Sequence, residues 1–277
     1  MIAIPAVSVG HAPDFSSVGV GVVHGVFAHA VNFVIRGDLW TLLAADRADL
    51  PFGIRTALKD FAALGLRAGD PVNVRSGFVG IGAGDKRVVV DCRAATRWMP
   101  DFQNDQAPGL GDRLDIVASA VRDRSWHGSA EMAHAVMSAL NEPDKLRDVL
   151  AEVVGRGPGL TPSGDDVLVG ILAVLTSPHS GEEGAGAAES LGRLIAPLLP
   201  TTTDVSGHLL RQAADGQFGR AVHELRSALI GNPTPEQLHD TVLRVVETGA
   251  TSGADTCEGL LEFAPSFFTT HNERAAA

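Results

Sequence analysis

The spacing of apolar residues changes along the chain, and this change limits the possible fold more than any other feature. Between residues 18 and 97 the apolar runs are short, partly alternating, and broken by Gly and Asp, as in Val18-Gly-Val-Gly-Val-Val. From about residue 110 apolar residues recur every three or four positions, as at Leu114, Val117 and Val121. Alternation is typical of strands, and a spacing of three or four is typical of helices. The sequence therefore predicts a β-rich front and a helical back.

The distribution of charge supports this division. All twelve glutamates lie at or beyond Glu131, and glutamate favours helices over strands. Residues 1–100 hold ten basic and eight acidic residues, a net of +2, whereas residues 101–277 hold 12 basic and 25 acidic residues, a net of −13. The total of −11 argues against a nucleic-acid partner, because binding to a phosphate backbone needs a net basic face.

The expected fold class is α+β. We predict a small β-barrel or sandwich-like domain of five or six short strands over residues 1–105, with a short helix at 56–64. A mainly α-helical domain follows over residues 106–277, with the almost wholly apolar Val167–Leu175 as a central buried helix. Further helices are predicted at 143–154, 187–198, 205–214, 218–230, 235–248 and 256–264. A polar, Gly-rich loop is predicted at 177–186.

No segment has the features of a targeting signal or of a membrane anchor. The N-terminus lacks the basic region of a signal peptide, and Val167–Leu175 is about half of the ~20 residues that a membrane span needs. We therefore expect a cytoplasmic protein with no membrane partner, in which Cys92 and Cys257 are free thiols.

The most unusual run is Gly155-Arg-Gly-Pro-Gly-Leu-Thr-Pro-Ser-Gly-Asp-Asp166. Thr161 is a good N-cap and Pro162 suits a first turn, so a helix is predicted to begin here. The glycines leave amide N–H groups accessible, and a helix N-terminus with exposed amides binds anions. Asp165 and Asp166 would repel a bare anion, so the run suits a carbamoyl or ureido group, or a phosphate bridged by a divalent cation. The alternative is a capped helix whose two Asp side chains bond to nearby N–H groups.

Two other predicted helix starts also combine small and hydroxyl-bearing residues with an Asp. The run Thr248–Thr256 is small and hydroxyl-rich, and its Asp255 would meet Asp165 and Asp166 if the two helix starts converge; the alternative is a loop with a cap. The run Thr201–His208 is better explained as an ordinary cap. Asn32, between apolar residues of a predicted strand, is either a satisfied core amide or a ligand donor. No zinc spacing, Gly-x-Ser-x-Gly elbow or P-loop occurs.

Together these motifs resemble the AllH family, a subunit of bacterial oxamate carbamoyltransferase in anaerobic allantoin breakdown, a branch of purine degradation and nitrogen metabolism. The specific element is Gly-Leu-Thr-Pro-Ser-Gly-Asp-Asp at 159–166, with supporting similarity at 23–32, at 206–216, and at 251–255 with Gly259. The resemblance spans about residues 20–265. It implies a role in phosphorolysis of oxalurate to oxamate and carbamoyl phosphate, or the reverse. It also implies an acyl-CoA-synthetase-like subunit and a second large subunit as partners, usually with a carbamate kinase nearby.

The first hypothesis is a carbamoyltransferase or one of its subunits, acting on a small ureido or oxamate-type substrate. Asp166 or Asp165 would be catalytic, as a base, as an acceptor for an NH2 group or as a ligand of Mg²⁺, the only cofactor indicated. The predicted ligand-binding residues are Arg156, Gly157, Gly159, Leu160, Thr161, Ser163, Gly164, Asn32, Ser206, Thr251, Ser252 and Asp255. The second hypothesis is a non-catalytic ligand-binding or assembly subunit. The third is a metal-dependent amide or glycoside hydrolase with Asp165, Asp166 and Asp255 on a divalent cation.

Overall fold

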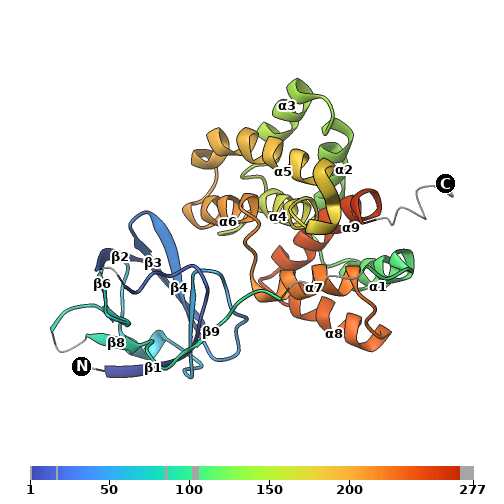
Figure 1. Cartoon of the computed structure of the whole chain (residues 1–277). Coiled ribbons are helices and arrows are strands. Elements are labelled where there is room, and N and C mark those ends of the chain that lie inside the picture. Colours follow the sequence, from blue (N-terminus) through green and yellow to red (C-terminus); the bar gives the residue numbers. More distant parts are fainter. Residues whose placement is uncertain (1, 17, 85–86, 102–105, 269–277) are drawn as a thin grey trace. The chain divides into compact units, whose positions relative to one another are not determined.

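The computed structural model describes residues 2–16, 18–84, 87–101 and 106–268 of the chain. It divides into two compact units, Met1–Asp101 and Phe102–Ala277, which we name the N-terminal unit and the helical unit. All the strands lie in the first and all the α-helices in the second, within the described residues (Figure 1). The predicted α+β class is therefore confirmed, and the N-terminal unit takes the barrel form rather than the sandwich.

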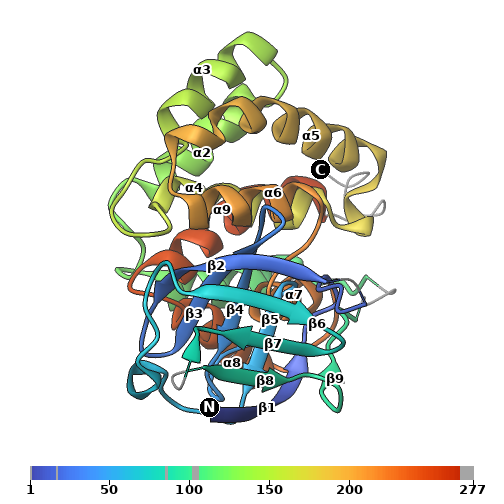
Figure 2. The ribbon, with the colours of Figure 1, turned by 90° about the vertical axis from the view of Figure 1, so that its left-hand side faces the viewer.

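The described part of the N-terminal unit contains nine strands (Figure 2). Eight of them close into a barrel in the order β5-β4-β3-β2-β6-β7-β8-β1, because β1 also pairs with β5, and β9 adds to β1. The strands are β1 (Ile2–Val9), β2 (Gly19–Val26), β3 (Ala30–Ile35), β4 (Asp38–Leu43), β5 (Gly53–Thr56), β6 (Pro71–Arg75), β7 (Phe78–Ile81), β8 (Val88–Asp91) and β9 (Thr96–Arg97).

Strand β1 closes the barrel, although the sequence pattern did not predict it. Its first half, Ile2–Pro5, runs parallel to β8, and from Ala6 onwards it pairs antiparallel with β5. Pro5 stands where the strand changes partner, and a proline within an apolar run weakens the expectation of a strand. The prediction of five or six strands was too low, because β1, β5 and the two-residue β9 were not expected. The short helix predicted at 56–64 was also wrong, because Gly53–Thr56 is strand β5 and only Ala62–Leu64 forms a turn of 3₁₀ helix.

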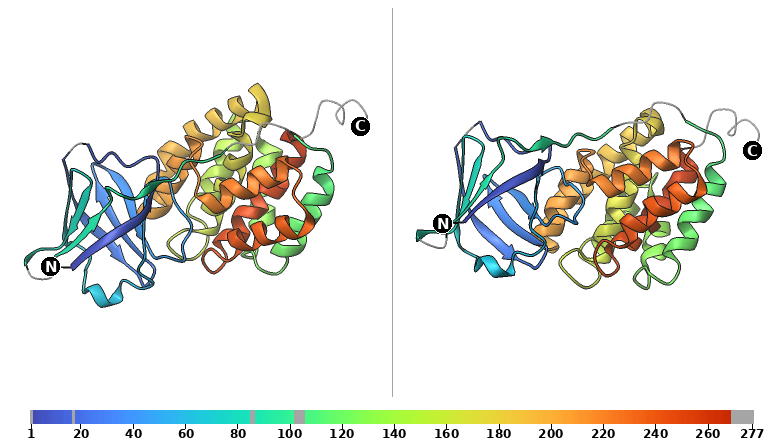
Figure 3. Two further views of the ribbon diagram at one scale, coloured as in Figure 1. Left: turned by 60° about the horizontal axis from the view of Figure 1, so that its bottom comes forward. Right: turned by 90° about the horizontal axis from the view of Figure 1, so that it is seen from below.

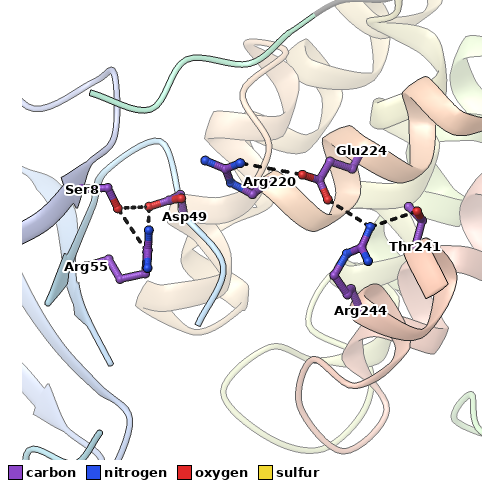
Figure 4. Close-up of polar contacts among 7 residues, drawn as sticks. All are labelled: Ser8, Asp49, Arg55, Arg220, Glu224, Thr241 and Arg244. Carbon is purple, nitrogen blue, oxygen red and sulfur yellow. Dashed lines mark hydrogen bonds and ion pairs between the residues drawn. The ribbon is translucent and has the colours of Figure 1, made fainter. Parts of the chain in front are cut away.

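A buried polar contact ties the two strands at the closure. Asp49 is 4% exposed and accepts a hydrogen bond from the hydroxyl of Ser8 on β1 (Figure 4). The guanidinium Nε of Arg55 on β5 donates to Ser8 Oγ at 3.1 Å and lies 3.3 Å from Asp49 Oδ1. Because a buried carboxylate needs a partner, Arg55 and Ser8 together offset the cost of burying Asp49.

The described part of the helical unit contains nine α-helices (Figure 3). They are α1 (Leu110–Val121), α2 (Ser129–Ala139), α3 (Pro143–Val153), α4 (Ser163–Leu175), α5 (Gly181–Ile195), α6 (Asp204–Ala214), α7 (Arg220–Ile230), α8 (Pro235–Val246) and α9 (Ser252–Phe267). On the outside of this unit, Arg220 of α7 and Arg244 of α8 flank Glu224, with Arg244 also bonded to Thr241 (Figure 4). These groups are partly exposed, so the ion pairs contribute little.

The prediction of a loop at 177–186 was wrong. A 3₁₀ turn over Pro178–Ser180 leads directly into α5, which begins at Gly181. Glu182 and Glu183 lie in the first turn, where negative charge is favourable to the helix dipole. Gly184 is buried there, and a Cβ on it would lie 2.3 Å from Ser180 Cβ. Gly184 therefore permits close packing of the helix against the preceding turn.

Helix α4 is the buried centre of the helical unit, as predicted for Val167–Leu175. Every residue of α4 except Val169 is buried, and the helix packs against α2, α5, α6, α7 and α9. Contact with α9 is the closest. A Cβ on Gly170 would lie 1.9 Å from the carbonyl oxygen of Thr256, and one on Gly259 would lie 2.1 Å from that of Val167. The two backbones can approach this closely only because both positions are glycine.

The two helices run in the same direction, and their starts therefore converge. Asp166, in the first turn of α4, is hydrogen-bonded to Ser252, the first residue of α9. One turn further along, Gly170 meets Thr256, and Ile171 meets Gly259. From one contact to the next the residue numbers rise along both helices, as parallel packing requires. Glycine contacts in the middle of the pair thus place two helix N-termini side by side.

Cys92 and Cys257 are both free and buried, as predicted. Across the part of the chain that the structure describes, no helix has both the length and the apolar character that crossing a membrane requires.

Replacing Gly170 by Ala tests the contact between α4 and α9. The new methyl group cannot fit against the Thr256 carbonyl, so the helices must separate, and we expect a loss of about 3 kcal/mol or more in the free energy of unfolding. The matched control is Gly186→Ala in α5, where a Cβ meets nothing within 4 Å. That variant is expected to gain up to about 1 kcal/mol. Urea unfolding of both variants measures the difference, and equal stabilities would contradict the packing argument.

Candidate functional site

The Gly-rich run forms the connection between α3 and α4. Gly155, Gly157 and Gly159 have φ values of +77°, +115° and +94°, a left-handed region that other residues rarely adopt. A Cβ on Gly157 would lie 2.7 Å from the backbone nitrogen of Ser163. The amide of Gly164 donates to the carbonyl of Arg156 at 2.8 Å. The loop therefore folds back onto the first turn of α4, and only glycine allows this path.

Asp165 holds this loop in place. It is 1% exposed, and its Oδ1 accepts a hydrogen bond from the amide of Gly155 at 2.8 Å. Its Oδ2 accepts hydrogen bonds from Ser206 Oγ at 2.6 Å and from the hydroxyl of Thr202. Both oxygens are thus engaged by groups of the loop and of the segment entering α6. Asp165 therefore bonds one backbone N–H group of the loop and two hydroxyls, and it does not cap α4, which has no side-chain cap hydrogen bond.

The helix itself starts differently from the prediction. Helix α4 begins at Ser163 with Pro162 as its N-cap residue, so Thr161 does not cap it. The hydroxyl of Thr161 instead lies 2.8 Å from Ser252 Oγ at the start of α9. Helix α9 begins at Ser252 rather than at 256, which places Asp255 in its first turn. The physical reason for the first difference is that a partner from a distant helix outcompetes the local amide for the Thr161 hydroxyl.

Several amides of the loop point to no protein acceptor. Among the described residues, the N–H groups of Gly157, Gly159, Leu160, Thr161 and Ser163 donate no hydrogen bond. Leu160 is 49% exposed at the tip of the loop, and the exposed Arg156 has a guanidinium with no partner in the described part of the chain. Free amides before a helix N-terminus are suited to bind oxygen atoms that carry negative charge.

Asp166 differs from its neighbour in sequence. It is 6% exposed, and its Oδ2 has no hydrogen-bond partner among the described residues. Burial raises the pKa of its carboxyl from the usual value near 4 to about 8. The negative charges of Asp255 and Asp165 raise the pKa further, whereas hydrogen bonds from Ser252 and Thr161 lower it. A carboxyl of this kind is protonated at neutral pH and can exchange a proton.

Asp255 comes from the second helix start. It is fully buried, and its Oδ1 accepts hydrogen bonds from the amide of Trp126 at 2.6 Å and from Ser129 Oγ at 2.7 Å. Its Oδ2 has no partner within the part of the chain that the structure describes. Nearby on α9, Glu258 accepts from Ser125 Oγ at 2.8 Å, and burial raises the pKa of Glu258. The connection between α1 and α2 therefore fixes one oxygen of Asp255 and leaves the other unpaired.

The unpaired groups gather at the converging helix starts. Six buried side-chain polar atoms lack a partner within the described ranges, and three of them belong to Ser163, Asp166 and Asp255. Buried polar atoms in native proteins are nearly always satisfied, so such a concentration needs an explanation. A bound ligand that supplies hydrogen-bond donors, or a proton, would satisfy them. This cluster, together with the free loop amides, is the candidate site.

The structure brings together most of the predicted site residues, with three qualifications. The hydroxyl of Ser206 is used by Asp165, and Thr251 is the N-cap residue of α9 without a side-chain cap bond. Asn32 lies on β3 in the N-terminal unit, where its Oδ1 accepts from Thr41 Oγ1 at 3.0 Å. No group of three or more metal-ligating side chains suited to a metal ion is found among the described residues.

Sequence reasoning missed the residues that anchor the carboxylates. Trp126 and Ser129 precede and begin α2, and Thr202 precedes α6. The polar run Ser125-Trp-His-Gly-Ser129 before a helix was a local signal for the first group. Nothing in the sequence shows that this run faces Asp255, which lies more than 120 residues away.

The role of Asp165 can be tested by Asp165→Asn. The substitution keeps the size of the side chain but replaces one acceptor by an NH2 group, which cannot accept from its present partners. We expect a loss of about 2–3 kcal/mol in the free energy of unfolding by urea. Asp112→Asn, in the exposed first turn of α1, is the control and should cost less than about 1 kcal/mol. A small effect at both positions would argue against the anchoring role.

The buried carboxyl of Asp166 also predicts how stability depends on pH. The folded chain keeps this proton up to about pH 8, whereas the unfolded chain loses it near pH 4. Because the folded state binds more protons in this window, the stability contribution falls as pH rises from about 4 to about 8, by up to roughly 5 kcal/mol. Asp166→Asn should remove this component. Urea unfolding across the window measures it, and curves of equal slope for both proteins would contradict it.

Comparison with known protein families agrees with this arrangement. The family model described as oxamate carbamoyltransferase subunit AllH matches residues 153–263, which include the Gly-rich loop, α4 and the first turns of α9. The model described as the AllH family N-terminal domain matches residues 7–97, most of the barrel. No solved structure matches the chain. The two matches cover most of the sequence, and the chain therefore belongs to the AllH family of oxamate carbamoyltransferase subunits.

Proposed function

We propose that this chain binds and helps to transfer the carbamoyl group in an oxamate carbamoyltransferase. The reaction is the phosphorolysis of oxalurate to oxamate and carbamoyl phosphate, or its reverse. The observation that carries the proposal is the cluster of unpaired, buried oxygens on Ser163, Asp166 and Asp255 beside the free amides of the loop. A ureido or carbamoyl group offers N–H donors to the first set and a carbonyl oxygen to the second.

In this proposal the loop amides stabilise charge on oxygen. As phosphate attacks the carbamoyl carbon of oxalurate, the carbonyl oxygen gains negative charge. The amides of Gly157, Gly159 and Thr161 can donate to that oxygen or to the phosphate. Donors fixed in advance in a partly buried site stabilise such charge more strongly than water does. Arg156 is the nearest cation in sequence and would offset the charge of the phosphate or of the substrate carboxylate.

Asp166 would exchange the proton. When the bond between the carbamoyl carbon and the bridging nitrogen breaks, its electron pair stays on that nitrogen, which becomes part of oxamate. The protonated carboxyl of Asp166 gives its proton to this nitrogen and regains one from hydrogen phosphate. The raised pKa of about 8 suits this acid role near neutral pH. In the reverse direction the ionised carboxylate takes the proton from the nitrogen of oxamate.

We further propose that the chain works with other subunits in the cytoplasm, including an acyl-CoA-synthetase-like protein and a second large subunit. Membership of a family of transferase subunits supports the need for partners. Asp165 serves this site as an anchor rather than as a proton carrier, because both of its oxygens already accept hydrogen bonds. The same bonds disfavour a metal-dependent hydrolase in which Asp165 is a ligand.

Asp166→Asn in the complex assembled with its partner subunits tests this role. We expect turnover of oxalurate and phosphate to fall by about 10²–10⁴, the usual loss when a general acid is removed. The fold should be unchanged, as judged by circular dichroism. The control is Asp144→Asn on the exposed face of α3, which should keep full turnover. Full turnover in the Asp166 variant would place the chemistry in a partner subunit and leave this chain as a binding or assembly subunit.

A further inference from the structure

The loop between α3 and α4 is held in place through its carbonyl oxygens. The carbonyl of Arg156 accepts from the amide of Gly164 at 2.8 Å, and the carbonyl of Pro162 accepts from two amides in the first turn of α4. The carbonyl of Leu160 accepts from the hydroxyl of Thr203, the N-cap residue of α6. The carbonyl groups of the loop thus supply contacts with the protein, whereas most of its N–H groups make none.

The backbone conformation of the loop suits these unused N–H groups to an anion. Gly157 and Gly159 have positive φ values, whereas Pro158 and Leu160 do not. Alternation of left-handed and right-handed residues turns successive N–H groups toward one side and forms a concavity that binds anions. The loop therefore has the backbone pattern of an anion site in addition to the helix start that follows it.

The hydroxyl of Ser163 is a separate indication of a ligand. The residue is 1% exposed, and its Oγ has no hydrogen-bond partner among the described residues. A Cβ on Gly157 would lie 2.7 Å from Ser163 N and 3.1 Å from Ser163 Oγ, so both polar groups of Ser163 face the bend of the loop. A buried hydroxyl without a partner is unfavourable, and nearly all such groups in native proteins are paired. Its O–H is a donor that the chain itself does not use.

The number of these donors indicates the class of ligand. Five loop amides and the Ser163 hydroxyl make six unused donors in the described residues. A carboxylate offers about four lone-pair sites on two oxygens in one plane, whereas a phosphoryl group offers roughly three strong acceptor oxygens in a tetrahedral arrangement. Hydrogen phosphate also keeps an O–H at neutral pH, which the unpaired Oδ2 of Asp166 can accept. The combination fits phosphate better than a carboxylate.

We propose that the Ser163 hydroxyl and the loop amides form a phosphate subsite in this chain. The subsite takes inorganic phosphate in one direction of the reaction and the phosphoryl group of carbamoyl phosphate in the other. The inference deepens the proposed function and rests on it for the reaction, because it assigns the loop amides to the phosphate rather than to the carbonyl oxygen. A hydroxyl both donates and accepts, so Ser163 can bond a phosphate oxygen and still accept from a carbamoyl N–H group.

Binding to the subsite can be measured on the full chain without partner subunits. Amide NMR of the isotope-labelled chain follows a titration with potassium phosphate, with potassium chloride holding the ionic strength constant. We expect saturable shifts at the amides of Gly157, Gly159 and Ser163, and the same amides should respond to carbamoyl phosphate. No saturable shift at these amides, or an equal response to oxamate as a simple carboxylate, would overturn the inference.

Ser163→Ala separates a binding role from a structural one. The variant should lower the affinity for phosphate about tenfold or more, since a hydrogen bond to a charged group is lost. Its stability toward urea should be kept or increased, because the removed hydroxyl has no partner in the ligand-free chain. The matched control is Ser180→Ala, whose buried hydroxyl donates to the carbonyl of Val174 at 2.6 Å. The control should lose stability and keep its affinity for phosphate.

The opposite pattern would contradict the subsite. If Ser163→Ala loses stability and keeps its affinity, the hydroxyl has a structural role. If Arg156→Gln abolishes phosphate binding while Ser163→Ala leaves it unchanged, the anion binds at the exposed guanidinium and the inference fails.

Turnover by the assembled complex distinguishes the subsite from the proposed function. Ser163→Ala should raise the KM for phosphate and leave the KM for oxalurate nearly unchanged. If phosphate shifts the loop amides but the complex does not turn over oxalurate, the subsite stands and the proposed function fails. If the complex is active but phosphate does not shift the loop amides, the subsite fails and the proposed function stands.

Discussion

The close contact of α4 with α9 is the constraint on which the site depends. Gly170 and Gly259 let the two backbones meet, since a Cβ at either position would lie about 2 Å from a carbonyl oxygen of the other helix. Helices that pack this closely and run in the same direction bring their N-termini together. Their dipoles and free amides then act on one small volume. The carboxylates of Asp166 and Asp255 lie in this volume because each is in the first turn of its helix.

The electrostatics of the site are local. Residues 101–277 carry a net charge of −13, which the +2 of residues 1–100 reduces to −11 for the chain, yet the candidate substrate is an anion. A field of this sign does not attract an anion, so the proposed function relies on local groups, namely the loop amides, Arg156 and a protonated Asp166. Adjacent carboxylates in one sequence motif have different environments here. Asp165 accepts three hydrogen bonds and fixes the loop, whereas Asp166 keeps an unpaired oxygen and a raised pKa.

The spacing of apolar residues predicted most of the helices well. The apolar helix Val167–Leu175 is buried as expected, and the helices predicted from Pro143 to the end of α8 lie within a few residues of their observed bounds, except α5. The patterns failed where a distant contact competes with a local one. Thr161 bonds Ser252 rather than capping α4, and the predicted loop at 177–186 is mostly helix, in which Gly184 packs closely against Ser180 and Leu175.

The sequence by itself determined the β-to-α order, the glycine loop before a buried helix and the presence of carboxylates in that first turn, because these depend on residues near one another in the chain. It also carried the motif by which the family is recognised. Only the tertiary structure decided which carboxylate is an anchor and which is free. That choice depends on donors from Thr202, Ser206, Trp126 and Ser129, which lie 37–129 residues from the groups that they bind. Hydrogen bonds and burial at such separations arise only from packing, which no local pattern encodes.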